Sequence, residues 1–516
     1  MKKNKTIKAH LSAFAVCGLL AQPGFATLVE MAEYQDWNGV QSSISTEDIN
    51  AVQPDGMTAL FWAVYYDKTD VARLLLNAGA NPNAESRYGL TPLIQAAMNG
   101  NSDMITMLLD AGADANASTP EGDNAILNAS RTGAAEGVLA LIEAGANVNS
   151  RDSYLWQTPL MWAAANNQAE VARILIANGA DMNAISAALD LRGVLQSRVQ
   201  GDFPDGGLTA LHHAARENGI AAARVLMESG ANLDIPDPQG ISPLRIAIIN
   251  ANLDLARMLV EGGANINDGA LVDLLDVETN KLTFVRAEKN YVNQTSPVDL
   301  MGIMFDMGVD VDAYPAKAYP FPATGFRGGE GTAGQTALFN AAARDKPELM
   351  TLFLEHGANP NSVNKGTRSG SYLPLSAAFA VVPGIYRPGT MDDEEYVPTI
   401  EELSSGVELL LEHGADINAA AMDGTTVLHH AASMGRDAVV EYLIANGADL
   451  SVRDNSNRTA LDVAMGVPEY KEGEDEPGEE PVYEEIVTLL TEAMNAQGIA
   501  IEQYVSPAST EESAEA

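Results

Sequence analysis

Histidine is the residue type in this chain with the clearest potential for chemistry, because it can ligate a metal ion or transfer a proton near neutral pH. Four of the seven histidines form two adjacent pairs, His212-His213 and His429-His430. Adjacent residues of a helix point about 100° apart, so neither pair can bind one ion from a single helix face. His356 and His413 each directly precede a Gly-Ala step, where we expect surface exposure. The histidines therefore predict no metal site.

Other catalytic motifs are absent or lack the necessary context. The sequence contains no HExxH, GxSxG or CxxC motif. Gly329, Gly331 and Gly334 formally match GxGxxG, but no strand precedes them and no βαβ frame surrounds them, which favours an enlarged loop over a nucleotide site. The many carboxylates show no identifying spacing. We therefore expect no catalytic residue, no bound metal and no cofactor.

A Gly-Ala step followed by Asn or Asp recurs along the chain, with Val replacing Ala at Gly308. The first intervals are 33, 33 and 34 residues, and such a fixed period predicts stacked supersecondary units rather than one globular core. The glycines of this step are Gly79, Gly112, Gly145, Gly179, Gly230, Gly263, Gly308, Gly357, Gly414 and Gly447.

Each unit has the signals of a helical hairpin. Thr58 and its equivalents can cap the first helix, and in several units Pro follows at the first helical position. Small pairs such as Ala96-Ala97 allow neighbouring inner helices to approach closely. Val71, Leu74 and Leu75 predict a buried stripe on the second helix. The Gly ends that helix with positive φ, and the following Asn or Asp bonds back onto the turn.

These units resemble the ankyrin repeat. The resemblance is carried by TALFWAV, TPLIQAA, TPLMWAA, TALHHAA, TALFNAA and TVLHHAA, each followed by endings such as LLNAGANPN or LLEHGADIN, and covers roughly residues 28 to 497. It implies an all-α solenoid of hairpins joined by β-turn or hairpin finger loops. It also implies that a His at the end of a Thr-x-Leu-His motif bonds to the cap region of its own hairpin. His212 and His429 occupy this position.

The resemblance gives a domain layout. We expect an N-terminal capping repeat at 27–50, ten repeats over 51–458 and a C-terminal capping repeat at 459–497, followed by a disordered acidic tail at 498–516. Irregular intervals predict insertions near 185–205 and 313–333 in finger loops, and near 279–297 and 382–400 between paired helices. The unit beginning at Asp268 lacks the Thr-Pro-Leu signature, so its first helix, 270–277, is predicted only by phase. Trp156 stands where a turn Gly is expected.

Residues 1–26 have the pattern of a signal peptide. Four lysines precede a short apolar run at 11–20, and Gly24-Phe25-Ala26 supplies a cleavage site after Ala26. The run is shorter than the roughly 20 residues that a membrane span needs. Val16 before Cys17 argues against a lipoprotein. We expect a bacterial protein that is periplasmic or secreted and that lacks disulfides, because Cys17 is the only cysteine.

The chain is strongly acidic. Its formal net charge is −40, and loss of four leader lysines leaves 26 basic against 70 acidic residues, a net charge of −44. Nucleic acid is disfavoured as a partner because phosphate binding needs basic patches. A basic protein, a polycationic ligand or divalent cations would be attracted to this charge, and solubility in a salty external medium explains the charge at least as well. The acidic loop 469–485 lacks the ligand spacing of a calcium loop, so we expect a solvated surface loop.

Binding to a partner protein is the function that the resemblance implies, with a chain that is monomeric on its own. Groove and finger positions of the repeats vary while the framework does not, and aromatic residues and Arg dominate protein-binding hot spots. Trp62 and Trp162 are expected to pack between repeats, and Tyr154 and Asp237 to lie in fingers. The predicted partner-binding residues are Tyr65, Tyr66, Tyr88, Met98, Asn99, Arg131, Asn166, Arg216, Glu217, Ile249, Arg344 and Met434.

Two other functions remain open at this stage. The inserted loops of repeats 7–9 could together form a pocket, which would make the protein a small-ligand receptor or a hydrolase-type enzyme. Alternatively, the protein could be an accessory subunit that stabilises an exported enzyme.

Overall fold

The structure, a computed structural model, describes residues 27–189, 205–280, 292–315, 334–365, 371–379, 399–468, 481–502 and 504. The described chain forms two compact units. The first extends to Tyr154 and includes Ala177–Gly179, and the second comprises Leu155–Ile176 and the residues from Ala180 onward. The signal peptide predicted at 1–26, most residues of the four insertions, most of the acidic loop and the tail beyond 504 lie outside the described residues.

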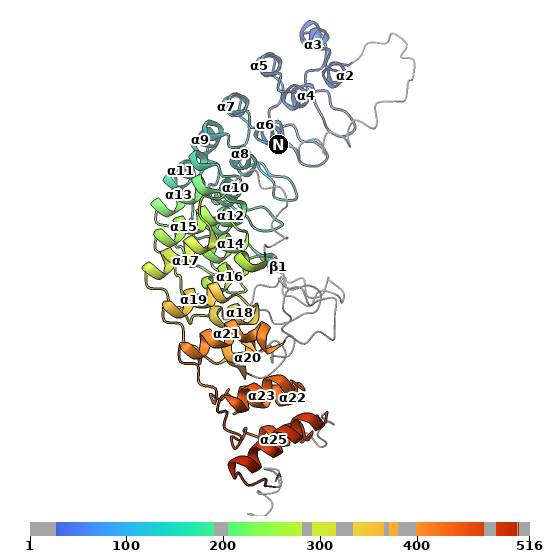
Figure 1. The fold of residues 1–516 in the computed structure, drawn as a ribbon. Coiled ribbons are helices and arrows are strands. Elements are labelled where there is room, and N and C mark those ends of the chain that lie inside the picture. The colour runs from blue at the N-terminus through green and yellow to red at the C-terminus, as the bar shows by residue number, and fades with distance from the viewer. Residues whose placement is uncertain are drawn as a thin grey trace, which may run out of the picture. The chain divides into compact units, whose positions relative to one another are not determined.

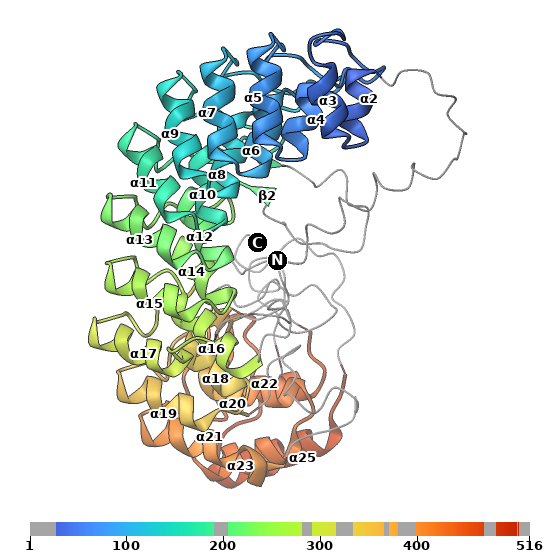
Figure 2. The same ribbon diagram turned by 90° about the horizontal axis from the view of Figure 1, so that it is seen from above.

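Helical hairpins build the first unit, and its inner helices pack side by side in the order α2, α4, α6 and α8 (Figure 2). The outer helices α3, α5, α7 and α9 follow the same order. The bounds are α2 Leu28–Glu33, α3 Trp37–Ser43, α4 Ala59–Tyr65, α5 Thr69–Asn77, α6 Pro92–Asn99, α7 Ser102–Asp110, α8 Ala125–Thr132 and α9 Ala135–Glu143.

The second unit continues the same alternation (Figure 1). Its helices are α10 Pro159–Ala165, α11 Ala169–Ala177, α12 Ala210–Glu217, α13 Ile220–Glu228, α14 Pro243–Ile249, α15 Leu253–Glu261, α16 Ala270–Asn280, α17 Pro297–Asp306, α18 Ala337–Ala343, α19 Pro347–Glu355, α20 Pro374–Ala378, α21 Ile400–Glu412, α22 Val427–Ser433, α23 Asp437–Ala445, α24 Ala460–Ala464 and α25 Glu484–Gln497. Its strands are β1 Ala188–Leu189, β2 Asp205–Gly206, β3 Asn364–Lys365 and β4 Ser371–Tyr372.

The prediction of an all-α array of stacked hairpins is confirmed. Strands within the described residues are two residues long and form two antiparallel hairpins, β1 with β2 and β3 with β4. Ala188 pairs with Gly206, and Asn364 pairs with Tyr372. Both hairpins precede an inner helix, so they extend finger loops and contribute no sheet to the core.

The hairpin of α6 and α7 begins and ends as its local signals predict. The hydroxyl of Thr91 accepts a hydrogen bond from the backbone N–H of Ile94 (3.3 Å), and Pro92 occupies the first helical position of α6. Gly112 follows α7 with φ of +88°, a conformation that glycine adopts without a steric penalty. Trp156 has a φ of +55° at a position where other fingers place Gly.

Packing between hairpins is apolar and close. Ala96 and Ala97 of α6 are fully buried, so the inner helices approach each other across small side chains. One member of the buried stripe predicted on the outer helix is wrong. Leu74 is 44% exposed, whereas Ala72 is fully buried beside Val71 and Leu75. Burying a side chain such as Leu75 contributes roughly 2 kcal/mol, which each hairpin gains only when a neighbour covers it.

Repeat 7, built from α16 and α17, continues the stack in the second unit although it lacks the Thr-Pro-Leu signature. Its helix α16 packs between α14 and α18 and extends to Asn280, three residues beyond the bound predicted from phase. Gly269 precedes it with φ of +101°, and a Cβ there would lie 2.5 Å from the backbone nitrogen of Pro315. Only glycine fits this entry into the helix.

The start of the tail, predicted as disordered from residue 498, is partly ordered instead. Gly498 ends α25 in the left-handed conformation. Beyond it, Glu502 forms an ion pair with Arg453 (3.1 Å), and the Tyr504 hydroxyl donates to the carbonyl oxygen of Ser456 (3.2 Å). These contacts attach residues 502 and 504 to the last finger loop.

Candidate functional site

A ladder of side-chain amides links successive turns at the ends of the outer helices. The Nδ2 of Asn116 donates to the carbonyl oxygen of Gly145 (2.9 Å), and its Oδ1 accepts from the backbone N–H of Asn147 (3.1 Å). Asn50, Asn83 and Asn361 make the same two bonds to the following turn. These amides therefore belong to the framework and are not available for a partner.

The residue directly after the Gly-Ala step bonds back onto its own turn, as predicted. Asn81 Oδ1 accepts from the backbone N–H of Asn83 (3.0 Å), and Asp114 does the same for Asn116 (2.9 Å). The second amide, which reaches the next repeat, was not predicted from the sequence. Its signal was the Asn that follows at a constant spacing of two residues.

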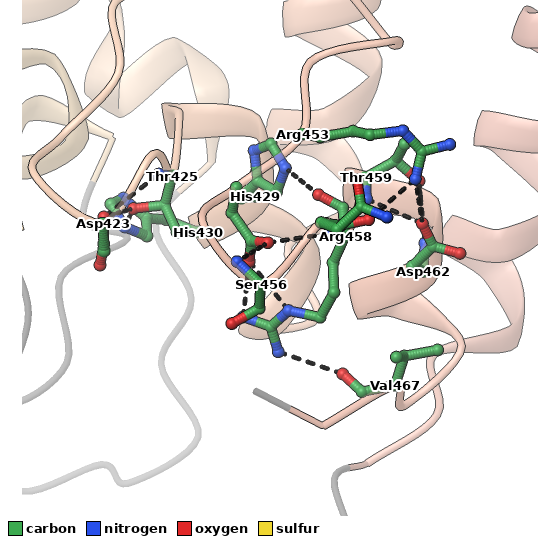
Figure 3. Close-up of polar contacts among 12 residues, drawn as sticks. Asp423, Thr425, His429, His430, Arg453, Ser456, Arg458, Thr459, Asp462 and Val467 are labelled. Carbon is green, nitrogen blue, oxygen red and sulfur yellow. Dashed lines mark hydrogen bonds and ion pairs between the residues drawn. The ribbon is translucent and has the colours of Figure 1, made fainter. Parts of the chain in front are cut away.

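The first histidine of each pair is a structural residue. In His429, Nδ1 contacts the backbone nitrogen (3.2 Å) and hydroxyl (2.9 Å) of Thr426, and Nε2 lies 3.1 Å from the carbonyl oxygen of Arg458 (Figure 3). His212 makes the same contacts with Thr209 and with the carbonyl of Ile241. The cap contact predicted from the resemblance is confirmed, and the ring also joins two hairpins.

Burial keeps these rings neutral. Desolvation lowers the pKa of His212 to about 4, against a weaker opposing effect of the hydrogen bond to Ile241. Desolvation also lowers the pKa of His429. A ring that is neutral and fully bonded is suited to holding two hairpins together, because both nitrogens already have partners. It cannot act as a proton carrier at neutral pH.

The second histidines have different surroundings. His430 contacts the hydroxyl of Thr425 through Nε2 (2.9 Å) and that of Ser376 through Nδ1 (3.3 Å), while Thr425 donates to Asp423 (2.5 Å). Figure 3 shows Asp423, Thr425 and His430 in one chain of contacts. Ser376 is fully buried, so a substrate cannot reach its hydroxyl and the chain does not form a nucleophilic site.

His213 is buried with one ring nitrogen unsatisfied. Its side chain is 2% exposed, its Nδ1 lies 3.4 Å from an Nη of Arg216, and its Nε2 has no hydrogen-bond partner. Desolvation, followed by the charges of Arg216 and His212, lowers the pKa of His213 to about 3. Burial and the two neighbouring side chains therefore disfavour the protonated form of His213.

Two ion pairs hold repeat 7 between its neighbours. Arg245 of α14 binds Asp273 of α16 through two bonds, Nε to Oδ2 at 2.6 Å and Nη2 to Oδ1 at 3.1 Å, with side chains only 1% and 5% exposed. Arg344, the residue directly after α18, pairs with Asp276 of α16 and donates to the Thr279 hydroxyl (2.7 Å). Charged contacts thus join α16 to the residues on both sides of it in the stack.

A small cavity lies beside the histidine pair of α22. It has a volume of about 170 Å³ and is lined by Thr425, His429, His430, Ser433, Arg458, Val463, Val467 and Pro481. The polar groups at its wall already have partners, since Arg458 binds Asp454 (2.8 Å) and the carbonyl of Val467 (3.1 Å). Small-molecule sites usually have volumes of about 300–1,000 Å³, so this cavity is small for a ligand.

Several residues predicted at partner-binding or finger positions are exposed as expected. Tyr88 and Tyr154 of the fingers are 61% and 75% exposed, and Met98 at the end of α6 is 39% exposed. Trp156, which is 58% exposed, was not among the predicted site residues. Its large exposed ring at a finger position was the signal that could have identified it.

Four residues expected at the surface instead have structural contacts. The hydroxyl of Tyr66 donates to the carbonyl of Glu33 (3.3 Å), and Asn99 Nδ2 donates to the carbonyl of Val64 (2.8 Å). Arg344 is 11% exposed in the ion pair described above. Asp237 is 4% exposed, because its Oδ1 accepts two backbone N–H groups of its own finger turn.

The remaining predicted positions are at least partly accessible. Asn166 and Arg216 are exposed, and Arg216 pairs with Glu217 (3.3 Å). Arg131 donates to Asn128 (2.7 Å) on its own helix. His356 and His413 are exposed, as predicted. The half-buried members of the predicted set are Tyr65, Tyr66, Asn99, Arg131, Glu217, Ile249, Arg344 and Met434.

Within the described ranges, no group of three or more His, Cys, Asp or Glu side chains is placed to hold a metal ion. Over the same part of the chain, no helix combines the length and the apolar character that crossing a bilayer requires. Gly329 and Gly331 of the GxGxxG match, and the inserted loops that could form a pocket, lie outside the described residues.

Comparison with known families assigns these hairpins. Ankyrin repeats (3 copies) match residues 28–119, 95–186 and 191–270, ankyrin repeats (many copies) match 410–464, and a single ankyrin repeat matches 333–365. The chain belongs to the ankyrin-repeat family. The matched segments include the turns, caps and His contacts described above.

Individual relatives share only part of their length with this ankyrin-repeat chain. The B-cell lymphoma 3 protein homolog of Mus musculus is 29% identical over 264 residues, which are 50% of this chain and 48% of the relative. The E3 ubiquitin-protein ligase KEG of Arabidopsis thaliana is 23% identical over 312 residues, 59% of this chain and 16% of the relative. This chain thus spans less than half the length of either protein.

Among solved structures, the human ASB11 ankyrin repeat domain is similar, with a TM-score of 0.39 and 23% sequence identity. The match covers 47% of this chain and 99% of that domain.

Proposed function

We propose that the protein is an exported, non-enzymatic ankyrin-repeat scaffold that binds a partner protein through its groove and finger loops. The observation that carries the proposal is the exposure of Tyr88, Met98 and Tyr154 in the first unit. The framework around them is satisfied by caps, buried alanines and amide ladders. Large side chains that the framework does not use, placed on rigid hairpins, are the usual anchors of a protein interface.

The histidines and the cavity favour binding over chemistry. The polar side-chain groups of His212, His429 and Arg458 already bind structural partners. The cavity of about 170 Å³ is small for a substrate. A macromolecular partner that covers an extended surface fits these features better than a small ligand that must be enclosed.

Charge favours a basic partner. The chain has 70 acidic against 30 basic residues, and several of the latter, such as Arg245 and Arg458, are buried in ion pairs. Each of these pairs also buries an Asp, so the acidic excess of the chain is unchanged by them. Acidic surfaces accelerate association with cationic partners and oppose the approach of nucleic acid.

Export is supported by the leader pattern at 1–26. Cleavage after Ala26 would leave Thr27 at the new N-terminus. Thr27 caps α2, since its hydroxyl accepts from the Glu30 backbone N–H (3.4 Å) and its own N–H donates to the Glu30 carboxylate (2.8 Å). The predicted cleavage site thus directly precedes the residue that caps α2, and we place the mature protein in the periplasm or outside the cell.

Co-purification of the tagged full-length protein from the periplasmic and extracellular fractions tests the proposal. The double variant Tyr88→Ala/Tyr154→Ala should weaken binding of the isolated partner by at least tenfold, because each exposed anchor contributes about 1–2 kcal/mol. Leu74→Ala/Leu139→Ala is the matched control, since both leucines are exposed but lie on the outer helices α5 and α9. Absence of a partner, or equal losses for both variants, would contradict the proposal.

A further inference from the structure

Four aromatic rings meet where α3 and α4 approach each other in the first unit. The rings of Trp62 and Tyr66 are stacked, with centroids 5.9 Å apart and planes inclined by 22°. Tyr65 contacts both edge-on, at 5.6 Å from Trp62 and 5.0 Å from Tyr66, and Trp37 lies 5.9 Å from Tyr66. We call Trp37, Trp62, Tyr65 and Tyr66 the N-terminal aromatic cluster.

The N-terminal aromatic cluster is held rigidly but is not buried. All four rings are half-buried. The indole Nε1 of Trp62 donates to Gln53 (3.0 Å), whose amide donates to Glu33 (2.6 Å), and the Tyr66 hydroxyl donates to the Glu33 carbonyl. Rings with fixed orientation and partly open faces lose little conformational entropy when a partner covers them.

The surroundings of the cluster attract cations. Residues 27–70 contain eight acidic residues and one basic residue, Lys68. The Nζ of Lys68 already lies 5.9 Å from the ring centroid of Trp37. Elsewhere in the first unit, the guanidinium carbon of Arg87 lies 5.1 Å from the ring centroid of Tyr88. Ring faces of this unit therefore already bind cationic side chains of the same chain.

We infer that the N-terminal aromatic cluster is a docking site for arginine side chains in a basic segment of the partner. The inference rests on the proposed function and names the chemistry that this part of the surface recognises. A planar guanidinium can stack on a ring face while its N–H groups point to carboxylates, and it needs no enclosed cavity. Lysine carries the same charge but lacks the planar group, so it should bind the cluster more weakly.

The test uses the mature full-length chain and a hexa-arginine peptide as probe, with affinity measured by calorimetry in 0.15 M NaCl. Tyr65→Leu removes a ring without changing the charge, and should weaken hexa-arginine binding about five- to tenfold, the size expected for a cation–π contact. Tyr65→Phe keeps the ring and should bind as the unchanged chain does. Tyr314→Leu, at a tyrosine of the second unit that is 52% exposed, controls for aromatic residues in general.

Three outcomes would overturn the inference: equal affinity of Tyr65→Leu and the unchanged chain, an equal loss for Tyr314→Leu, or equal binding of hexa-lysine and hexa-arginine. Circular dichroism and thermal unfolding of each variant separate a folding defect from a lost contact, and Tyr65→Phe provides the folded reference. Hexa-arginine binding is measured without the native partner. Failure here therefore leaves the co-purification result intact, and failure to find a partner leaves this measurement interpretable.

Discussion

Replacement of Arg245 by Met should destabilise the second unit far more than loss of an ordinary surface ion pair. The variant retains volume but leaves the Asp273 carboxylate buried, with its side chain 5% exposed and both bonds to the guanidinium lost. Breaking a buried pair from one side costs about 3–5 kcal/mol, because the remaining charge is uncompensated. The double variant Arg245→Met/Asp273→Leu removes both charges and should recover most of this loss.

The pH dependence of the Arg245→Met variant provides an independent check. Burial raises the pKa of Asp273 to about 6 even with Arg245 present, and removal of the cation should raise that pKa further. A carboxyl whose pKa is raised in the folded state contributes stability at low pH and loses it as the pH rises through the folded pKa. The destabilisation should therefore be larger at pH 8 than at pH 5.

Urea unfolding, combined with amide hydrogen exchange of α14 and α16, measures the effect locally, because long repeat arrays need not unfold in one step. Arg257→Met is the matched control, since the Arg257–Glu261 pair on α15 has similar geometry (2.7 Å) but side chains 49% and 51% exposed. Similar losses for Arg245→Met and Arg257→Met, or no recovery in the double variant, would refute the argument from burial.

Three further predictions concern single residues. His213→Leu should reduce the fall in the free energy of unfolding between pH 6.5 and pH 4. The pKa of His213 in the folded state is about 3, so only the unfolded chain gains a proton on this ring in that range. At pH 4 the variant should therefore avoid a loss of about 3 kcal/mol in the free energy of unfolding, measured with urea. An unchanged slope would show that other groups set it. Asn116→Ala removes both bonds to the next turn and should lower stability by about 1–2 kcal/mol, whereas Asn446→Ala, whose amide bonds only within its own helix end, should have a smaller effect. Trp156→Gly should raise the thermal midpoint by relieving about 1 kcal/mol of strain at φ of +55°, and a lowered midpoint would mean that ring contacts outweigh it.

The array and its hairpins were predictable because their signals are local. A Thr hydroxyl caps a helix three residues away, a Gly takes positive φ at its own position, and Asn81 binds Asn83. Each signal recurs in phase, so even α16 was placed correctly without its own signature. The prediction for Leu74 failed for the opposite reason: the side chains of a helix that are buried depend on the hairpin packed against it, which is not a local signal.

Which side chains are available at the candidate site depends on contacts between repeats, and these contacts could not be predicted from the sequence. Arg344 and Met98 occupy comparable free positions near the ends of inner helices, yet Arg344 finds Thr279 at a separation of 65 residues and Asp276 beside it, while Met98 remains 39% exposed. Likewise, Tyr66 reaches Glu33 at a separation of 33 residues. Short-range hydrogen bonds and backbone conformation determine that a hairpin forms, and they are encoded by adjacent residues. Whether a side chain is free for a partner depends on which neighbouring hairpin it meets, and this is decided only when the repeats stack.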